Sequence, residues 1–293
     1  MSSASYIYIS KHSLMNKKFF FLLLLPVLTG IETVKAATVD TLLTYSQVMK
    51  KNIKAVVISP DNSKQKSLFP VVYLLHGHGG NYADWISRVS ELKSYADQYQ
   101  VLIVCPDGGP ASWYFDSLEQ SMSRYETYIT KELLSIIDQK YPTIKERKGR
   151  AITGLSMGGH GALYLAFKHQ DIFSAAGSMS GGLDLRPFPN NWNLSAHLGK
   201  YAEKPEQWER NSVINLTHLL TPGSLKLLID CGTGDFFYDV NKAFHLKLMA
   251  LNVPHDFISR PGEHNWDYWR NAVQYQLLFM KKHFESMQTK KSN

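Results

Sequence analysis

The chain has 293 residues, and its 32 basic and 25 acidic side chains give a formal net charge of +7. This mildly basic balance, without a basic run interleaved with aromatic residues, gives no support for nucleic-acid binding. Only Cys105 and Cys231 are present, and each ends or follows an apolar run that predicts a separate strand. We therefore expect two free, partly buried thiols rather than a disulfide scaffold.

The first 36 residues are predicted to be an N-terminal extension and a signal peptide, outside the fold. Lys17 and Lys18 precede the apolar run 19–28, and Val34-Lys35-Ala36 supplies small residues at the positions that a signal peptidase reads. The run is about half the length needed to cross a bilayer, so it does not predict a transmembrane helix. We expect an exported protein, periplasmic or secreted, with no stable membrane insertion after cleavage.

Residues 37–293 predict a single α/β domain, with a mostly parallel central sheet flanked by helices on both faces. Short apolar runs alternate with stretches of helical periodicity at 125–137 and 266–277. Several runs are apolar throughout, as expected of strands covered on both faces. The predicted strands are Lys54–Ile58, Val71–Leu75, Val101–Cys105, Ala151–Thr153, Ala175–Met179, Leu225–Ile229 and Asp256–Ser259.

Residues 183–222 interrupt this alternation. The segment is rich in proline and asparagine, carries Trp192 and Trp208, and contains no clear strand pattern. A long excursion at this point can form a cap over a substrate cleft, and the alternative is a surface insertion without a role.

Gly154-Leu155-Ser156-Met157-Gly158 is a G-x-S-x-G pentapeptide between the predicted strand 151–153 and a predicted helix at 159–166. Glycines two residues on either side of a serine permit a sharp strand-to-helix turn that lifts the hydroxyl out of the sheet. An ordinary turn is the alternative, but the strand–turn–helix context favours a nucleophile. Ser156 is therefore the candidate nucleophile of an acyl-transfer enzyme.

A serine hydroxyl needs a histidine that removes its proton and a carboxylate that orients the histidine. In this type of sheet the order along the chain is serine, then acid, then histidine. Asp235 follows the predicted strand 225–229 in a glycine-bearing loop, and His264 lies in a loop that leaves the last predicted strand. Because the carboxyl ends of parallel strands share one edge, we expect both residues near Ser156.

Other acids and histidines fit these roles less well. Asp239 is the closest rival to Asp235, but it is predicted to lie within the next helix. His160 follows the nucleophile and is expected to be a packed residue. His76 and His78 form an H-x-H pattern with no third ligand at suitable spacing, so we predict neither a metal nor another cofactor. The remaining rivals, which we predict to be structural or wrongly placed, are Asp230, Asp256 and Glu263.

Catalysis also needs donors for the developing oxyanion. One predicted donor is the backbone N–H of Met157, at the start of the helix after the nucleophile. The second is expected from the glycine-rich loop 76–81, where we favour the backbone N–H of His78. Trp113 and Tyr114 are candidate substrate-binding aromatics. Trp192 and Trp208 could line the same cleft, and burial in the core is the alternative for all four.

Five segments carry a resemblance to a known family: Tyr73–Gly77, Pro106–Gly109, Ser112–Tyr114, Gly154–Ala162 and Gly262–Trp266. Together they resemble the esterase family that includes tributyrin, feruloyl and acetyl xylan esterases, S-formylglutathione hydrolases and mycolyltransferases. The resemblance covers nearly all of residues 37–293 and is strongest to the tributyrin and feruloyl branch. A cysteine-containing segment usual in the formylglutathione branch, after the first glycine loop, is absent here.

The resemblance implies an α/β-hydrolase fold and a cofactor-free mechanism, with the nucleophile on Ser156, the acid on Asp235 and the base on His264. It places the oxyanion donors on the backbone of His78 and Met157. We therefore expect a secreted serine carboxylesterase that hydrolyses short-chain or carbohydrate-linked acyl esters, with a small-molecule or oligosaccharide ester as its partner.

Three alternatives remain open. The first is an acyltransferase to a sugar or lipid acceptor, which would use the same three residues. The second is a thioesterase similar to S-formylglutathione hydrolases. The third is a non-catalytic carbohydrate-binding protein on the same scaffold, which is less consistent with the sequence because all three catalytic candidates are present.

Overall fold

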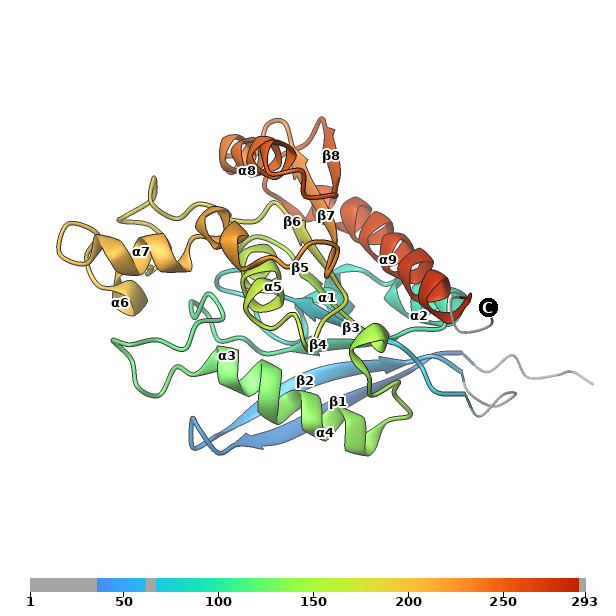
Figure 1. The fold of residues 1–293 in the computed structure, drawn as a ribbon. Coiled ribbons are helices and arrows are strands. Elements are labelled where there is room, and N and C mark those ends of the chain that lie inside the picture. The colour runs from blue at the N-terminus through green and yellow to red at the C-terminus, as the bar shows by residue number, and fades with distance from the viewer. Residues whose placement is uncertain (1–35, 62–66, 290–293) are drawn as a thin grey trace, which may run out of the picture. The chain divides into compact units, whose positions relative to one another are not determined.

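The computed structural model describes residues 36–61 and 67–289 (Figure 1). The predicted extension and signal peptide, residues 1–36, therefore lie outside the described residues except for Ala36. Within the described ranges, no helix combines the length and the apolar character that crossing a membrane requires.

The centre of the domain is an eight-stranded sheet with the order β1-β2-β4-β3-β5-β6-β7-β8. Neighbours from β4 to β8 are parallel, whereas β2 pairs antiparallel with both β1 and β4. The mostly parallel sheet is thus confirmed. The strands are β1 Thr38–Ser46, β2 Lys51–Ser59, β3 Val71–Leu75, β4 Leu102–Pro106, β5 Arg150–Gly154, β6 Ala175–Met179, β7 Lys226–Gly232 and β8 Asp256–Arg260.

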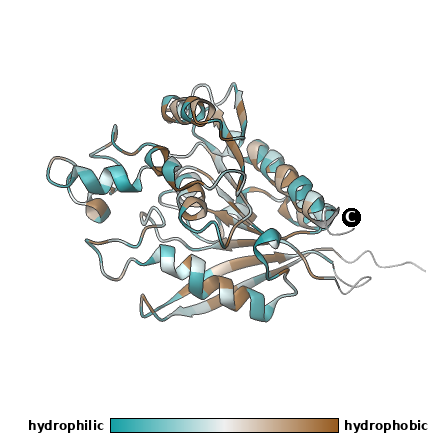
Figure 2. Cartoon of the chain, in the orientation of Figure 1, coloured by the Kyte–Doolittle hydropathy of each residue, from teal (hydrophilic) through white to brown (hydrophobic). Residues whose placement is uncertain are grey.

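Helices cover both faces of the sheet, as the apolar runs predict. Along β3, Val71, Tyr73 and Leu75 pack into one core cluster, and Val72 and Leu74 pack into the other. The first cluster is closed by α3 (Tyr125–Thr127), η1 (Tyr128–Leu133), α4 (Leu134–Lys140), α5 (Met157–Lys168) and α8 (Tyr238–Ala250). The second is closed by α1 (Asp84–Arg88), α2 (Leu92–Tyr99) and α9 (Trp266–Thr289). Figure 2 shows brown residues concentrated in the strands, with brown and teal mixed on the helices.

The helix predicted over 125–137 is present but not uniform, because η1 is a π-helical stretch between the α-helical α3 and α4. A short 3₁₀ helix, η2 (Arg147–Gly149), precedes β5. Both cysteines are free, as predicted, but they are fully rather than partly buried.

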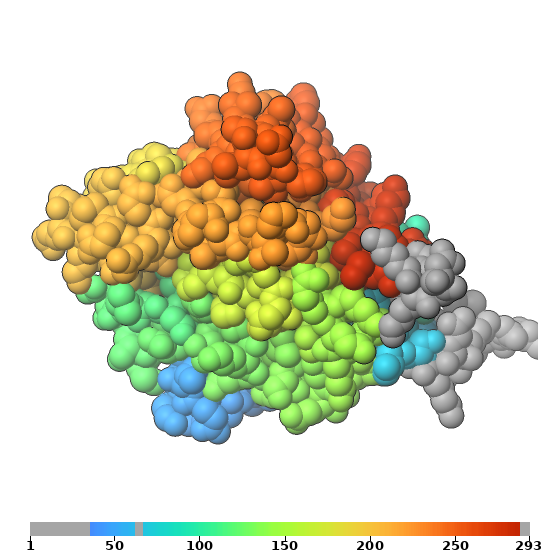
Figure 3. Space-filling view, in the orientation of Figure 1, coloured from blue at the N-terminus to red at the C-terminus, as the bar shows by residue number. Residues whose placement is uncertain are grey.

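The segment 183–222 is described in full and contains α6 (Ser195–Leu198), α7 (Pro205–Asn211) and the 3₁₀ helix η3 (Val213–Leu219), with no strand. Trp208 is buried within it. Its surface, yellow to orange in Figure 3, borders the green surface of residues 110–125. Contacts across this border include the ion pair between Lys204 and Glu119 and a hydrogen bond from the Ser117 hydroxyl to the His197 carbonyl, 3.2 Å long.

Candidate active site

Ser156 sits in the sharp turn between β5 and α5. Its φ of 53° lies in the left-handed region, which residues with a Cβ rarely adopt. The neighbouring glycines make this turn possible, because a Cβ on Gly154 would lie 2.6 Å from backbone atoms of Gly158. A Cβ on Gly158 would lie 2.5 Å from the backbone oxygen of His76. Both contacts are with main chain that cannot easily move, which explains the G-x-S-x-G spacing.

The structure brings Ser156, His264 and Asp235 together. The Ser156 Oγ lies 2.9 Å from Nε2 of His264. The Nδ1 of the same ring lies 3.0 and 2.9 Å from the two carboxylate oxygens of Asp235. A carboxylate only accepts, so Nδ1 carries the proton and Nε2 is free to take one from the serine.

Backbone bonds join the two loops that carry the acid and the histidine. The N–H of Thr233 donates to the Arg260 carbonyl at 2.9 Å, and the N–H of Gly234 donates to the Gly262 carbonyl at 2.8 Å. The side chain of Asp235 is fully buried and also accepts the backbone N–H of Phe237 at 2.8 Å. The carboxylate is therefore fixed in its orientation behind the imidazole.

The rival residues have other partners. Asp230 is buried and accepts hydrogen bonds from the Tyr268 hydroxyl and the Arg260 guanidinium. Burial raises the pKa of Asp230, and those two bonds partly offset the rise. Asp239 lies in the first turn of α8, as predicted. His160 is fully buried and bonds the Asn211 carbonyl at 2.7 Å, and burial lowers its pKa to about 4.

The two histidines of the H-x-H pattern face different partners. His76 is buried; its Nε2 accepts the N–H of Gly108 at 2.7 Å, which leaves Nδ1 to donate to the Gly77 carbonyl at 2.8 Å. His78 is exposed, and its Nε2 lies 3.2 Å from Oδ1 of Asn193. An amide oxygen only accepts, so His78 donates in this bond.

Both predicted oxyanion donors border Ser156. Met157 is the first residue of α5, and the first N–H groups of a helix have no acceptor within it. In the glycine-rich loop, the N–H of Gly79 donates to the Pro110 carbonyl at 2.7 Å and that of Gly80 to the Gly77 carbonyl at 3.1 Å. Those two amides are therefore engaged, and the N–H of His78, the residue directly before them, stays the predicted second donor.

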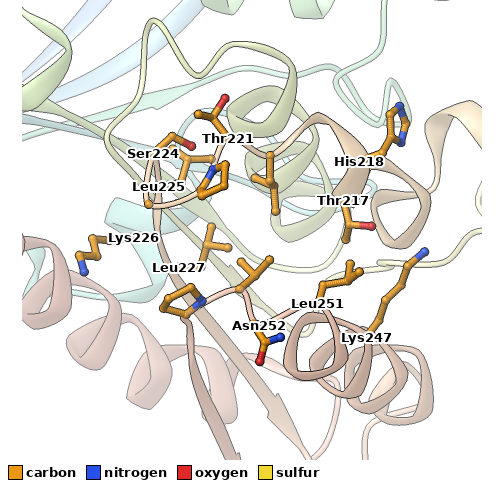
Figure 4. Close-up of a pocket in the computed structure, with 15 residues that line it drawn as sticks. Thr217, His218, Thr221, Ser224, Leu225, Lys226, Leu227, Lys247, Leu251 and Asn252 are labelled. Carbon is orange, nitrogen blue, oxygen red and sulfur yellow. The ribbon is translucent and has the colours of Figure 1, made fainter.

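Ser156 opens into a cavity of about 490 Å³. Its aromatic walls come from Trp192, Phe236, Trp266 and Trp269. Sequence reasoning missed Phe236, although it directly follows the predicted acid. A separate cavity of about 600 Å³ lies at the other end of β7, where Leu225 and Leu227 form part of its lining (Figure 4).

Trp113 and Tyr114 do not line the cavity at Ser156. Both side chains lie in the core, and the Tyr114 hydroxyl donates to the His76 carbonyl at 3.1 Å. The ring of Tyr114 also packs against Gly108 and Gly161. The structure thus corresponds to the core alternative for these two residues, because the chain is buried continuously from Ser112 to Phe115.

Aromatic rings surround the imidazole of His264. The ring of Phe236 lies 4.1 Å from it, centroid to centroid, and Trp269 meets it edge-on at 4.8 Å. Trp192 stacks on the outer side of Phe236 at 5.5 Å with an interplanar angle of 19°. These ring contacts help to hold the imidazole in place between the loop that carries Asp235 and helix α9.

Trp192 and Asn193, in segment 183–222, form a turn beside the active site. Their φ angles are 48° and 58°, so two consecutive residues with side chains lie in the left-handed region. The Trp113 indole N–H donates to the Trp192 carbonyl at 3.2 Å. The turn thereby contacts Phe236, in the loop that carries Asp235, and His78, in the glycine-rich loop 76–81.

This fold, with a serine on a strand-to-helix turn and a histidine and a buried carboxylate in reach, defines an α/β-hydrolase. Residues 46–280 match the family model described as "Putative esterase", and the chain belongs to this family of ester hydrolases.

Similarity to known proteins supports the assignment to this esterase family. The chain is 28% identical over 262 residues to an acetyl esterase of Caldicellulosiruptor saccharolyticus, covering 81% of this chain and 96% of that protein. A solved ferulic acid esterase is 29% identical with a TM-score of 0.73, covering 85% of this chain and 98% of the other. The S-formylglutathione hydrolase of Staphylococcus aureus, at 23% identity and a TM-score of 0.73, covers 84% and 99% and shares the fold.

Proposed function

We propose that the protein is an exported serine esterase that hydrolyses short-chain or carbohydrate-linked acyl esters through an acyl-enzyme on Ser156. The observation that carries this proposal is the continuous chain of hydrogen bonds from Ser156 Oγ through the His264 ring to Asp235, at 2.9 to 3.0 Å. Such a chain lets a neutral serine act as a nucleophile near neutral pH.

The first half-reaction forms the acyl-enzyme. Oγ of Ser156 attacks the ester carbonyl carbon while its proton passes to Nε2 of His264. The carbonyl oxygen becomes an oxyanion that accepts the N–H groups of His78 and Met157. The intermediate collapses, the bond to the alcohol oxygen breaks, and the imidazolium gives its proton to the departing alkoxide.

The second half-reaction releases the acid. Water gives a proton to Nε2 of His264 and attacks the acyl carbon. The bond to Ser156 Oγ then breaks, and the imidazolium returns the proton to the serine. Asp235 stays ionised throughout and stabilises the imidazolium. Because the serine opens into a cavity rather than lying in a closed core, water has access to the acyl-enzyme, which supports hydrolysis over transfer.

The substrate class is supported by the relatives and by the cavity walls. Two proteins that resemble the chain at 28 and 29% identity are named for acetyl and ferulic esters. The flat rings of Trp192 and Phe236 suit a planar acyl group or the face of a sugar. Export is supported by the charged, apolar and small-residue pattern of residues 15–36.

The test is hydrolysis of p-nitrophenyl acetate, p-nitrophenyl butyrate and methyl ferulate. The wild type should turn over at least one of these esters and should be labelled once by a fluorophosphonate. Ser156→Ala should lose both properties, whereas Ser87→Ala, at an exposed serine, should keep them. Turnover that survives in Ser156→Ala would refute the mechanism, and added alcohol acceptors that become acylated in preference to water would favour the acyltransferase.

A further inference from the structure

The residue directly before the first strand is buried and is held by a side chain from another element. Ala37 lies directly before β1 and is only 3% exposed, whereas Ala36 is exposed. The backbone nitrogen of Ala37 donates to Oδ2 of Asp97, on α2, at 2.7 Å. The Ala37 methyl belongs to the same buried cluster as Ile58 of β2.

Asp97 lies at a position where a nearby cation would be stabilised. It lies in the last turn of α2, whose carbonyl end carries partial negative charge, and that turn contains no basic side chain. Its other oxygen accepts the backbone N–H of Asp61 at 2.8 Å. Across the described part of the chain, no lysine or arginine side chain forms an ion pair with Asp97.

The sequence independently marks the peptide bond just before this nitrogen. Val34 and Ala36 occupy the third and first positions before a signal-peptidase site, so the cleaved bond would be Ala36–Ala37. Hydrolysis of that bond adds one water, leaves a carboxylate on Ala36 and frees the nitrogen of Ala37 as an amine. An α-amino group with an ordinary pKa of about 7.7–8.0 is largely protonated at neutral pH.

We propose that Asp97 is the receptor for the mature N-terminus: after a signal peptidase cuts at Ala36–Ala37, the new α-ammonium of Ala37 forms an ion pair with Asp97. The inference rests on the proposed export and not on the esterase chemistry. Processing converts a neutral amide donor into a cation at the same position, and charge-assisted bonds are roughly twice as strong as neutral ones. The mature end is thereby tied to the sheet edge at β1 and to α2.

The register of β1 explains why the position of the cut matters. Thr38 pairs with Ser59, so Ala37 is the last residue before the sheet begins. A cut one residue later would remove the buried methyl and move the ammonium onto the strand. A cut one residue earlier would carry the ammonium onto the exposed Ala36, away from the carboxylate.

The first experiment determines the end itself. The full chain is produced in a bacterial host that exports it, and the intact mass of the exported protein is measured. A mass that corresponds to a start at Ala37 supports the proposal, and any other start overturns it. The result is independent of whether Ser156 is the nucleophile, which is tested by turnover alone.

The second experiment isolates the charge. A chain that begins at Ala37 is prepared with a free and with an acetylated α-amine, because acetylation keeps the N–H donor but removes the charge. Acetylation should lower the melting temperature by about 2–4 °C in the wild type, the shift expected for about 1 kcal/mol in a domain of this size. The shift should vanish in Asp97→Asn and persist in Glu91→Gln, at an exposed acid beside the start of the same helix. Equal shifts in all three proteins, or none in the wild type, would overturn the ion pair.

A reactivity measurement gives a readout that packing alone does not change. The α-amine of the Ala37 chain is labelled with a limiting amine-reactive ester, and the N-terminal peptide is quantified against lysine peptides of the same protein. The ion pair predicts that Asp97→Asn speeds α-amine labelling several-fold without changing the lysines. An unchanged labelling ratio would contradict the proposal even if the variant is less stable.

Discussion

The hydrogen bond between His78 and Asn193 offers a test of how segment 183–222 acts on the reaction. His78 carries a predicted oxyanion N–H on its backbone, while its exposed ring donates to Asn193 at 3.2 Å. We expect Asn193→Gly and His78→Ala to lower kcat, because each removes a contact that holds the glycine-rich loop 76–81 in place. Glycine suits the φ of 58° at position 193, and alanine keeps the backbone N–H of residue 78, so neither change removes the predicted oxyanion donor or adds backbone strain.

The expected fall in kcat can be estimated from the one hydrogen bond that each variant removes. One exposed hydrogen bond contributes about 1 kcal/mol net, which corresponds to about fivefold in rate if all of it is lost from the transition state. Complete loss of an oxyanion donor costs about 3–4 kcal/mol, which sets the upper limit. The loop keeps its bond from Gly79 to Pro110, so the expected fall in kcat is about three- to tenfold, with KM little changed.

The assay is a double-mutant cycle on p-nitrophenyl butyrate, with active sites counted by fluorophosphonate labelling. The double variant Asn193→Gly with His78→Ala should be no slower than either single variant, because both remove the same bond. The inhibition constant of a trifluoromethyl ketone, whose adduct places an oxyanion in the site, should rise by the same factor as kcat falls. Asn191→Ala is the matched control at an exposed asparagine nearby. Effects that multiply in the double variant, or a fall in kcat without weaker ketone binding, would refute the reasoning.

Two further predictions concern buried carboxylates. Asp235→Asn should lower kcat by about 10⁴, because an amide facing Nδ1 of His264 favours the tautomer that cannot accept the serine proton. The control Asp239→Asn should keep a kcat near that of the wild type. A fall of less than tenfold in Asp235→Asn would exclude Asp235 as the acid. Burial acts to raise the pKa of Glu126, but bonds from His169, Lys168 and Tyr164 outweigh it and lower the pKa from 4.5 to about 2. The stabilisation from Glu126 is therefore fully present above about pH 4.5 and lost as the pH falls toward 2, by about 3 kcal/mol. Glu126→Gln should lack that part of the acid dependence in denaturant titrations, and an unchanged pH slope would contradict the assignment.

The sequence predicts seven of the eight strands of the sheet and misses β1. β3 and β6 have the predicted bounds because their residues are apolar or small throughout and bounded by turns. β1 escapes prediction because two of its three buried side chains, Thr44 and Ser46, are polar. The Thr44 hydroxyl bonds the Tyr128 hydroxyl, and the Ser46 hydroxyl bonds the Glu132 carboxylate. Because these partners lie far along the chain, nothing in the sequence around β1 indicates that its polar side chains are buried.

Ser156, Asp235 and His264 lie close together, as predicted, because each closely follows a parallel strand and these strands end at the same edge of the sheet. The walls of the cavity could not be derived in the same way. Trp192 reaches the site through a left-handed turn within a long excursion, and no periodicity specifies where such a turn points. Trp113 looks equally suitable in the sequence, yet its indole is buried and holds the Trp192 carbonyl instead.

The strain at Trp192 and Asn193 bears on how segment 183–222 works. Holding a residue with a side chain in a sparsely populated backbone region costs about 1–3 kcal/mol, and such strain persists only where the surroundings over-determine the conformation. Here the surroundings include the Trp113 indole and the rings of Phe236 and Phe237, all contributed by other parts of the chain. A lid that opened at every turnover would have to break these contacts and rebuild the strained turn each time. We infer that the segment is a fixed wall, so that substituting Trp192 should change which esters are accepted more than how fast the site opens.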